Sequence, residues 1–136
     1  MGLMDKFFGD KPPLIVVVDD SDEIATLLCM FLRARGYRVE RAKDGEEGVK
    51  LVQKTVPALV LLDITMPRLD GMGALNLIKL DPKTAHVPVL MCTDHSTLSD
   101  VEKCCGNGAA GYILKPFELT KVLEKVQSVI KEKKLE

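Results

Sequence analysis

The stretch "LIVVVDDSDE", residues 14–23, joins an apolar run to two adjacent carboxylates, Asp19 and Asp20. A short run of branched apolar residues that ends in polar ones is typical of a strand buried on both faces of a parallel sheet. A helical pattern follows, because apolar residues then recur with a period near 3.6 at Ile24, Leu27, Leu28, Phe31 and Leu32. Two like charges at the end of a buried strand repel each other, so something must hold them there.

The same alternation of strand and helix continues along the chain. Further strands are expected over residues 37–42, 58–63, 87–93 and 111–115. Gly36 is placed to end the first helix, and Asp44, with Glu47 three residues later, is placed to begin the next. Helical patterns also cover residues 71–80 and 119–130, and a short helix is expected over 96–105. About five strands with intervening helices predict an α/β fold: a doubly wound, mainly parallel sheet with helices on both faces.

Composition narrows the class of protein. The chain has 136 residues, enough for one domain, and its 19 Lys and Arg nearly balance its 20 Asp and Glu. This balance disfavours nucleic acid and membrane surfaces as partners, and neither a membrane span nor a signal peptide is evident, so we expect a cytoplasmic protein. The four cysteines lack metal-type spacing and are expected to be reduced thiols, with Cys29 and Cys92 in the core; a redox role for the vicinal pair Cys104-Cys105 is disfavoured.

Polar residues that could carry chemistry follow the expected strands. Sheets of this kind bind ligands beyond the carboxyl ends of their strands, where the chain places Asp19, Asp20, Asp63, Thr93 and Lys115. Carboxylates brought together there repel unless they are protonated or neutralised by a cation, and Mg²⁺ with oxygen ligands suits that task. The alternative, that the aspartates only cap helices, does not explain their presence at two strand ends beside a lysine and a threonine.

Four motifs give the chain a family resemblance: "VVVDDSD", "LLDITMPRLDGM", "VPVLMCT" and "GYILKPF". In this order and spacing, they resemble the receiver domain of two-component response regulators from about residue 13 to 131. The resemblance implies a flavodoxin-like five-stranded parallel sheet in the order 2-1-3-4-5. It also divides the chain into a tail, residues 1–12, and a receiver domain, residues 13–133.

The resemblance implies a role for each matching residue. Asp63 is similar to the phosphoacceptor, and Asp19 and Asp20 to the acidic pair that binds Mg²⁺ with it. The backbone carbonyl of Thr65 would be a further metal ligand, and Lys115 would contact the phosphoryl group.

The resemblance also implies how phosphorylation is sensed. Thr93 is similar to the switch hydroxyl, Tyr112 to the aromatic residue that changes rotamer with it, and the bond before Pro116 to the cis peptide of the family. Residues beside the site would tune the rate or the lifetime of phosphorylation: Thr65, Asp94 and His95. Asp94 departs from the family pattern, which usually has a small residue there, and we expect its carboxylate to change the rate of phosphorylation.

The implied function is a phosphorylation-activated signalling switch, not a turnover enzyme. Its phosphodonor would be a sensor histidine kinase or a histidine phosphotransfer protein. A monomer would then bind a protein target through the helix over 96–105, the strand over 111–115 and the last helix, without binding nucleic acid or entering a membrane. A chemotaxis-type regulator, a phosphorelay carrier and a receiver fragment of a larger regulator all fit this description.

Other readings remain open. A receiver-like module could bind partners without phosphorylation. A flavodoxin-like electron carrier would share the sheet, but the chain has no Trp and only two Tyr to stack on a flavin. A metal-dependent phosphatase could also use clustered aspartates around Mg²⁺.

Overall fold

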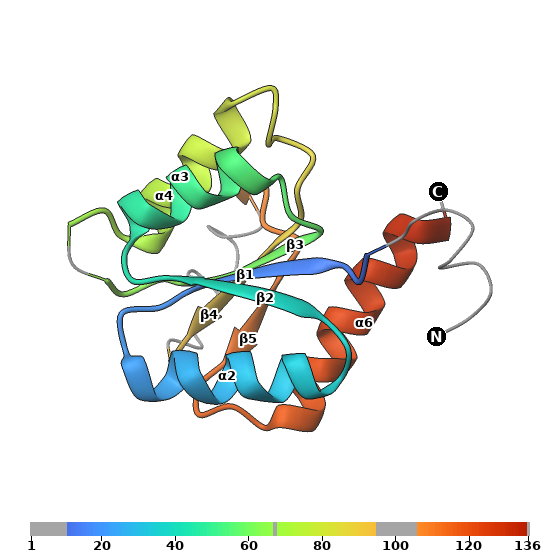
Figure 1. Ribbon diagram of the computed structural model, residues 1–136. Helices are drawn as coiled ribbons and strands as arrows, with labels where there is room; N and C mark the ends of the chain where they lie inside the picture. Colours follow the sequence, from blue (N-terminus) through green and yellow to red (C-terminus); the bar gives the residue numbers. More distant parts are fainter. Residues whose placement is uncertain (1–10, 67, 95–105, 136) are drawn as a thin grey trace.

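The structure, a computed structural model, describes residues 11–66, 68–94 and 106–135 (Figure 1). Strands alternate with helices along this part of the chain. The elements, labelled as in Figure 1, are β1 (Leu14–Val18), α2 (Asp22–Ala34), β2 (Arg38–Ala42), α3 (Gly45–Thr55), β3 (Leu59–Asp63), α4 (Gly71–Leu80), β4 (Val89–Thr93), β5 (Gly111–Leu114) and α6 (Leu119–Leu135).

The strands form one parallel sheet in the order β2-β1-β3-β4-β5, as the resemblance implies. All residues of β1, β3 and β4 are buried. This burial explains their almost continuous apolar sequences, because parallel strands covered on both faces do not alternate with polar residues. β2 lies on one side of β1, whereas β3, β4 and β5 follow on the other side, so the order of strands changes direction between β1 and β3. Ligands of such sheets bind at the carboxyl ends of the strands at this point.

Helices cover both faces of the sheet, as the sequence predicts. Figure 1 shows α3 and α4 on one face and α2 and α6 on the other. In β1, Val16 and Val18 belong to the core beneath α3 and α4, whereas Ile15 and Val17 belong to the core beneath α2 and α6. Successive side chains of a strand point to opposite faces, so one apolar run supplies both cores.

The two described cysteines are buried, as expected. Cys29 and Cys92 lie in the core beneath α2 and α6. Burial raises the pKa of the Cys92 thiol to about 12. A thiol with so high a pKa is protonated at neutral pH and is a weak nucleophile.

The helix ends follow the local signals in the sequence. Gly36 has a φ of 97°, and the N–H groups of Gly36 and Tyr37 donate to the carbonyls of Arg33 and Leu32, which closes α2. Asp44 begins α3 by accepting from the Glu47 N–H at 2.9 Å. The Glu47 carboxylate accepts from the N–H of Lys43, one residue before Asp44, so the capping box is shifted by one position.

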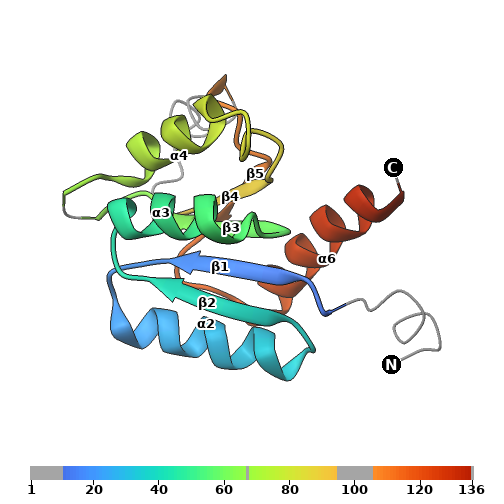
Figure 2. The same cartoon turned by 45° about the horizontal axis from the view of Figure 1, so that its top comes forward.

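The helices α2 and α3 begin within a few residues of the ends of β1 and β2. Figure 2 shows β1 and β2 pointing toward the edge of the sheet where α2 and α3 begin. Among the described residues, no helix combines the length and apolar character that a bilayer crossing requires. The helix expected over 96–105 and most of the expected tail, residues 1–10, lie outside the described residues.

Candidate functional site

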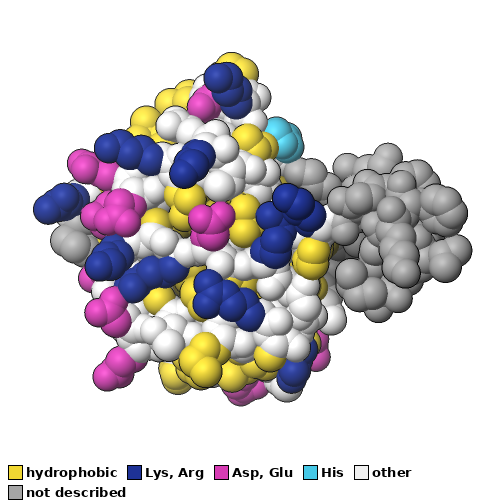
Figure 3. All heavy atoms as spheres, in the orientation of Figure 1, with side chains coloured by type: hydrophobic (Ala, Val, Ile, Leu, Met, Phe, Trp, Pro, Cys, Tyr) yellow, Lys and Arg dark blue, Asp and Glu magenta, His cyan; other side chains and the backbone are white. Residues whose placement is uncertain are grey.

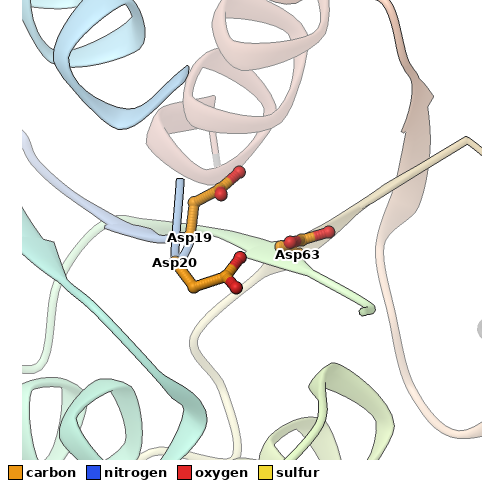
Figure 4. Close-up of side chains that lie close together, drawn as sticks. All are labelled: Asp19, Asp20 and Asp63. Carbon is orange, nitrogen blue, oxygen red and sulfur yellow. The ribbon is translucent and has the colours of Figure 1, made fainter. Parts of the chain in front are cut away.

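Three carboxylates meet at the carboxyl ends of the two neighbouring strands β1 and β3. Asp19 and Asp20 follow β1, and Asp63 is the last residue of β3. One oxygen from each carboxylate lies within 4.8 Å of the others. Asp19 and Asp63 are only 2 % and 4 % exposed, whereas Asp20 is exposed. Figure 4 shows the three side chains next to one another at the ends of their strands.

Lys115 brings a positive charge to this cluster from the carboxyl end of the edge strand β5. It follows β5, and its backbone N–H donates to the carbonyl of Thr93 at 2.8 Å. Its Nζ donates to Asp63 Oδ1 at 3.1 Å and to Asp19 Oδ2 at 3.4 Å. The sequence predicted these residues to converge, and the structure brings them together.

The charges of the cluster do not balance. Burial and the neighbouring Asp19 carboxylate raise the pKa of Asp63, although hydrogen bonds from Lys115 and from the Thr65 backbone N–H oppose the rise. Burial acts to lower the pKa of Lys115, but the carboxylates of Asp19 and Asp63 outweigh it and raise that pKa. Among the described residues, the Lys115 ammonium group pairs with two of the three carboxylates, which leaves net negative charge for a cation to neutralise.

The donor set fits a hard divalent cation such as Mg²⁺. All its ligand atoms are carboxylate oxygens, and Mg²⁺ binds through a few carboxylates while keeping several waters. Both oxygens of Asp19 already have partners, because Oδ1 accepts from the Ser21 N–H at 2.9 Å and Oδ2 accepts from Lys115. Asp20 and Asp63 are thus the better placed ligands, with Asp19 lending charge.

The other predicted residues differ in how deeply they are buried. Thr93, 4 % exposed, ends β4 beside the strand that carries Asp63. The side chain of Thr65 is exposed, as is Asp94, and Tyr112 is half-buried on β5 against the core beneath α3 and α4. The Lys115–Pro116 peptide bond is cis. His95 and the pair Cys104-Cys105 lie outside the described residues.

Two residues beside the site were not given such a role on sequence grounds. Gly71 begins the helix expected over residues 71–80, but a Cβ atom there would lie 2.2 Å from the carbonyl oxygen of Asp63, so the first turn of α4 rests directly on the end of β3. Asp70 is the N-cap of this helix and accepts from the Gly73 N–H at 2.9 Å, but such a cap signal marks only the helix start and not the contact with β3. Arg41, the second residue, donates two hydrogen bonds to the carbonyl of Asp19, a contact for which the sequence carries no local signal.

Comparison with known proteins agrees with this geometry. The family model described as "Response regulator receiver domain" matches residues 15–127. The chemotaxis protein CheY of Treponema pallidum is 38 % identical over 123 residues, which cover 88 % of this chain and 84 % of that protein. The DNA-binding dual master transcriptional regulator RpaA of Synechocystis is 33 % identical over 88 % of this chain, and the chain spans about half (49 %) of its length.

Solved structures show the same fold. The chemotaxis protein CheY4 of Vibrio cholerae superposes with a TM-score of 0.83 at 28 % identity, covering 87 % of this chain and 98 % of that one. The receiver domain of the sensor histidine kinase PA1611 from Pseudomonas aeruginosa, solved with a magnesium ion coordinated in its active site cleft, has a TM-score of 0.82 at 28 % identity, with 88 % and 98 % coverage. The match to the family covers most of the chain, and this chain therefore belongs to the response regulator receiver domains of two-component signalling systems.

Proposed function

We propose that this receiver domain accepts a phosphoryl group on Asp63 in the presence of Mg²⁺ and signals by binding another protein. The observation that carries the proposal is the cluster of three carboxylates at the carboxyl ends of β1 and β3, two of which, Asp19 and Asp63, pair with Lys115. Its excess negative charge is suited to a divalent cation. The Lys115 ammonium group lies next to Asp63, where a phosphoryl group would arrive.

The proposed reaction transfers a phosphoryl group from the donor to the carboxylate of Asp63. An oxygen of Asp63 forms a bond to phosphorus as the bond from phosphorus to the donor breaks, and the donor leaves with that electron pair. Phosphoryl transfer needs mainly positioning and charge neutralisation. Lys115, whose Nζ donates to Asp63, would pair with the phosphoryl oxygens, and Thr93, the last residue of the adjacent strand β4, would donate a hydrogen bond from its hydroxyl. Bound Mg²⁺, held by Asp20, Asp63 and the Thr65 carbonyl with Asp19 lending charge, would supply the remaining positive charge.

The switch would pass from Thr93 to Tyr112. Phosphorylation adds about −1.5 to −2 units of charge and strong acceptor oxygens, which draws the Thr93 hydroxyl toward the phosphoryl group. Tyr112 lies on the neighbouring strand β5 and lines a surface groove. A change in its rotamer would alter that groove, and with it the affinity for a target. The other residues that line it include Leu114, Pro116, Lys121 and Lys125.

The phosphodonor and the bounds of the receiver unit follow from the same function. A sensor histidine kinase or a histidine phosphotransfer protein would supply the phosphoryl group, and the receiver unit would span residues 13–133. The site would turn over only its own phosphoryl group, which makes the domain a switch rather than an enzyme acting on other substrates. Thr65, Asp94 and His95 would set the rates.

The test is the covalent mass of the protein after incubation with acetyl phosphate and Mg²⁺. We expect one phosphoryl adduct in the wild type, none without Mg²⁺ and none in Asp63→Asn. Asp44→Asn is the matched control, because Asp44 is an aspartate at a helix start that is not part of the carboxylate cluster, and asparagine caps a helix equally well. This variant should be phosphorylated like the wild type.

Other outcomes would change the assignment. An adduct that persists in Asp63→Asn would place the acceptor elsewhere. No adduct under any condition would reject phosphorylation and favour a receiver-like module that binds partners without it. Release of phosphate from small esters over many turnovers would instead support a metal-dependent phosphatase.

A further inference from the structure

Arg41 on β2 holds the backbone of the loop that carries the two adjacent aspartates. Its Nε and Nη2 donate to the carbonyl oxygen of Asp19 at 3.2 and 2.8 Å. Its Nη1 donates to Asp22 Oδ1 at 2.7 Å. The planar guanidinium thus joins the end of β1 to the start of α2, across the loop of residues 19–21.

The contact completes the immobilisation of Asp19. The N–H of this residue donates to the carbonyl of Ala42 at 3.2 Å, and its carboxylate accepts from the Ser21 N–H and from Lys115 Nζ. Its carbonyl is the remaining polar group, and that is where the Arg41 fork binds. Every polar group of Asp19 is therefore directed by a partner.

Fixing this carbonyl also orients the next residue. The carbonyl of Asp19 and the N–H of Asp20 belong to one planar peptide unit, so a rotation of that plane moves the side chain of Asp20. Asp20 is exposed, and no buried packing directs its carboxylate toward Asp63. The hydrogen bonds of Arg41 act on the peptide plane from which Asp20 projects.

We propose that Arg41 is a positioning residue for the divalent cation site: by holding the Asp19–Asp20 peptide, it keeps the Asp20 carboxylate aimed at Asp63. This inference rests on the proposed function, in which Asp20 and Asp63 share Mg²⁺. Outer partners that orient metal ligands commonly change metal affinity by about 10-fold to 100-fold when they are removed.

Two simpler roles for Arg41 give different expectations. An ion pair with Asp22 alone would contribute little, because the Asp22 side chain is 82 % exposed. A purely electrostatic role would oppose metal binding, since a positive charge beside the cluster repels a second cation. Figure 3 shows Lys and Arg interspersed with Asp and Glu over the face that includes β2 and α2, so no broad positive field is concentrated there. Geometry and charge can therefore be separated by substitution.

The experiment compares Arg41→Lys and Arg41→Gln with the wild type. Lysine keeps the charge but cannot form the fork, whereas glutamine loses the charge as well. Arg38→Lys and Arg38→Gln are matched controls, because Arg38 lies on the same strand and donates its Nε to the carbonyl of Pro12 at 2.8 Å, at the opposite end of β2. Mg²⁺ affinity is measured by calorimetric titration, and urea unfolding confirms that each protein is folded.

We expect both Arg41 variants to bind Mg²⁺ about tenfold more weakly than the wild type, and both Arg38 variants to bind it unchanged. The rate of phosphorylation by acetyl phosphate should need more Mg²⁺ in the Arg41 variants but approach the wild-type maximum at saturation. That split is not expected from a general loss of stability.

The outcomes separate the two proposals. Wild-type Mg²⁺ affinity in Arg41→Lys would overturn the positioning role alone, and tighter binding in Arg41→Gln would show that only charge matters. A wild-type protein that binds no Mg²⁺ would overturn the proposed function, and the positioning role would fall with it. If Arg41→Gln does not fold, Arg41→Lys decides the question.

Discussion

Replacing Gly71 by alanine should disturb the acceptor end of β3 without touching any acidic side chain. The new Cβ would lie 2.2 Å from the carbonyl oxygen of Asp63 and 2.6 Å from the Cα of Ile64. Contacts of a real Cβ stay beyond 3.0 Å, so α4 and the end of β3 must separate by about 0.8 Å. Both neighbours are backbone atoms, and no side-chain rotation can relieve the clash.

This separation predicts two measurable losses. Forced displacement in a packed region reduces the free energy of unfolding by about 1–3 kcal/mol. A misplacement near 1 Å at a reacting group lowers rates by up to about 100-fold, so phosphorylation by acetyl phosphate should slow by about tenfold or more. Urea unfolding measures the first effect and intact mass against time measures the second.

Gly73→Ala is the matched control on the same helix. A Cβ there would first meet the Leu69 side chain at 2.6 Å, and a flexible side chain can move away. Alanine also favours the helix by up to about 1 kcal/mol over glycine. We expect Gly73→Ala to be near wild type in both assays. If Gly71→Ala matches it in stability and rate, the close packing of α4 on β3 is not what places Asp63.

The remaining predictions concern charge and backbone strain. Because the pKa of Asp63 is raised in the folded protein, its contribution to the metal-free stability is present below the unfolded pKa and is lost as pH rises through the folded pKa. Asp63→Asn should remove this loss of stability with rising pH, measured as the free energy of urea unfolding at a series of pH values. An equal loss in both proteins would contradict the raised pKa of Asp63. Asp94→Ala removes an exposed carboxylate next to Thr93 and should speed phosphorylation by acetyl phosphate; equal rates would reject a role for Asp94. Val56 ends α3 with a φ of 44° and is 41 % exposed. Because asparagine adopts this left-handed conformation more readily than valine, Val56→Asn should raise the free energy of unfolding by about 1 kcal/mol. A lower urea midpoint would show that the backbone of Val56 is not strained.

Much of the fold follows from patterns that are local in the sequence. The apolar runs around Val16 and Leu61 predict buried strands, and the helix ends at Gly36 and Asp44 follow from backbone conformation and capping within a few residues. These features depend on neighbours along the chain, so periodicity and residue type suffice. The strand order came from the resemblance, because residues alone do not say which strands pair.

The candidate site was predicted as a set of residues at strand ends. Asp19, Asp20, Asp63 and Lys115 could be grouped because parallel strands bring their carboxyl ends to one edge. Their contacts join residues 52 and 96 positions apart, so the distances between Lys115 and its two carboxylates were not accessible from the sequence. The sequence pattern thus identifies which residues meet at the candidate site, but not how closely they approach.

Other features depend only on the path of the folded chain. The hydrogen bonds from Arg41 to Asp19 span 22 positions, and the approach of Gly71 to Asp63 depends on how α4 packs over the end of β3. Neither residue belongs to a periodic pattern that predicts its contact. The local sequence accounts for the strands, the helix ends and the acidic residues because their causes lie within a few positions. The geometry that turns those residues into a site arises only when the sheet brings distant segments together.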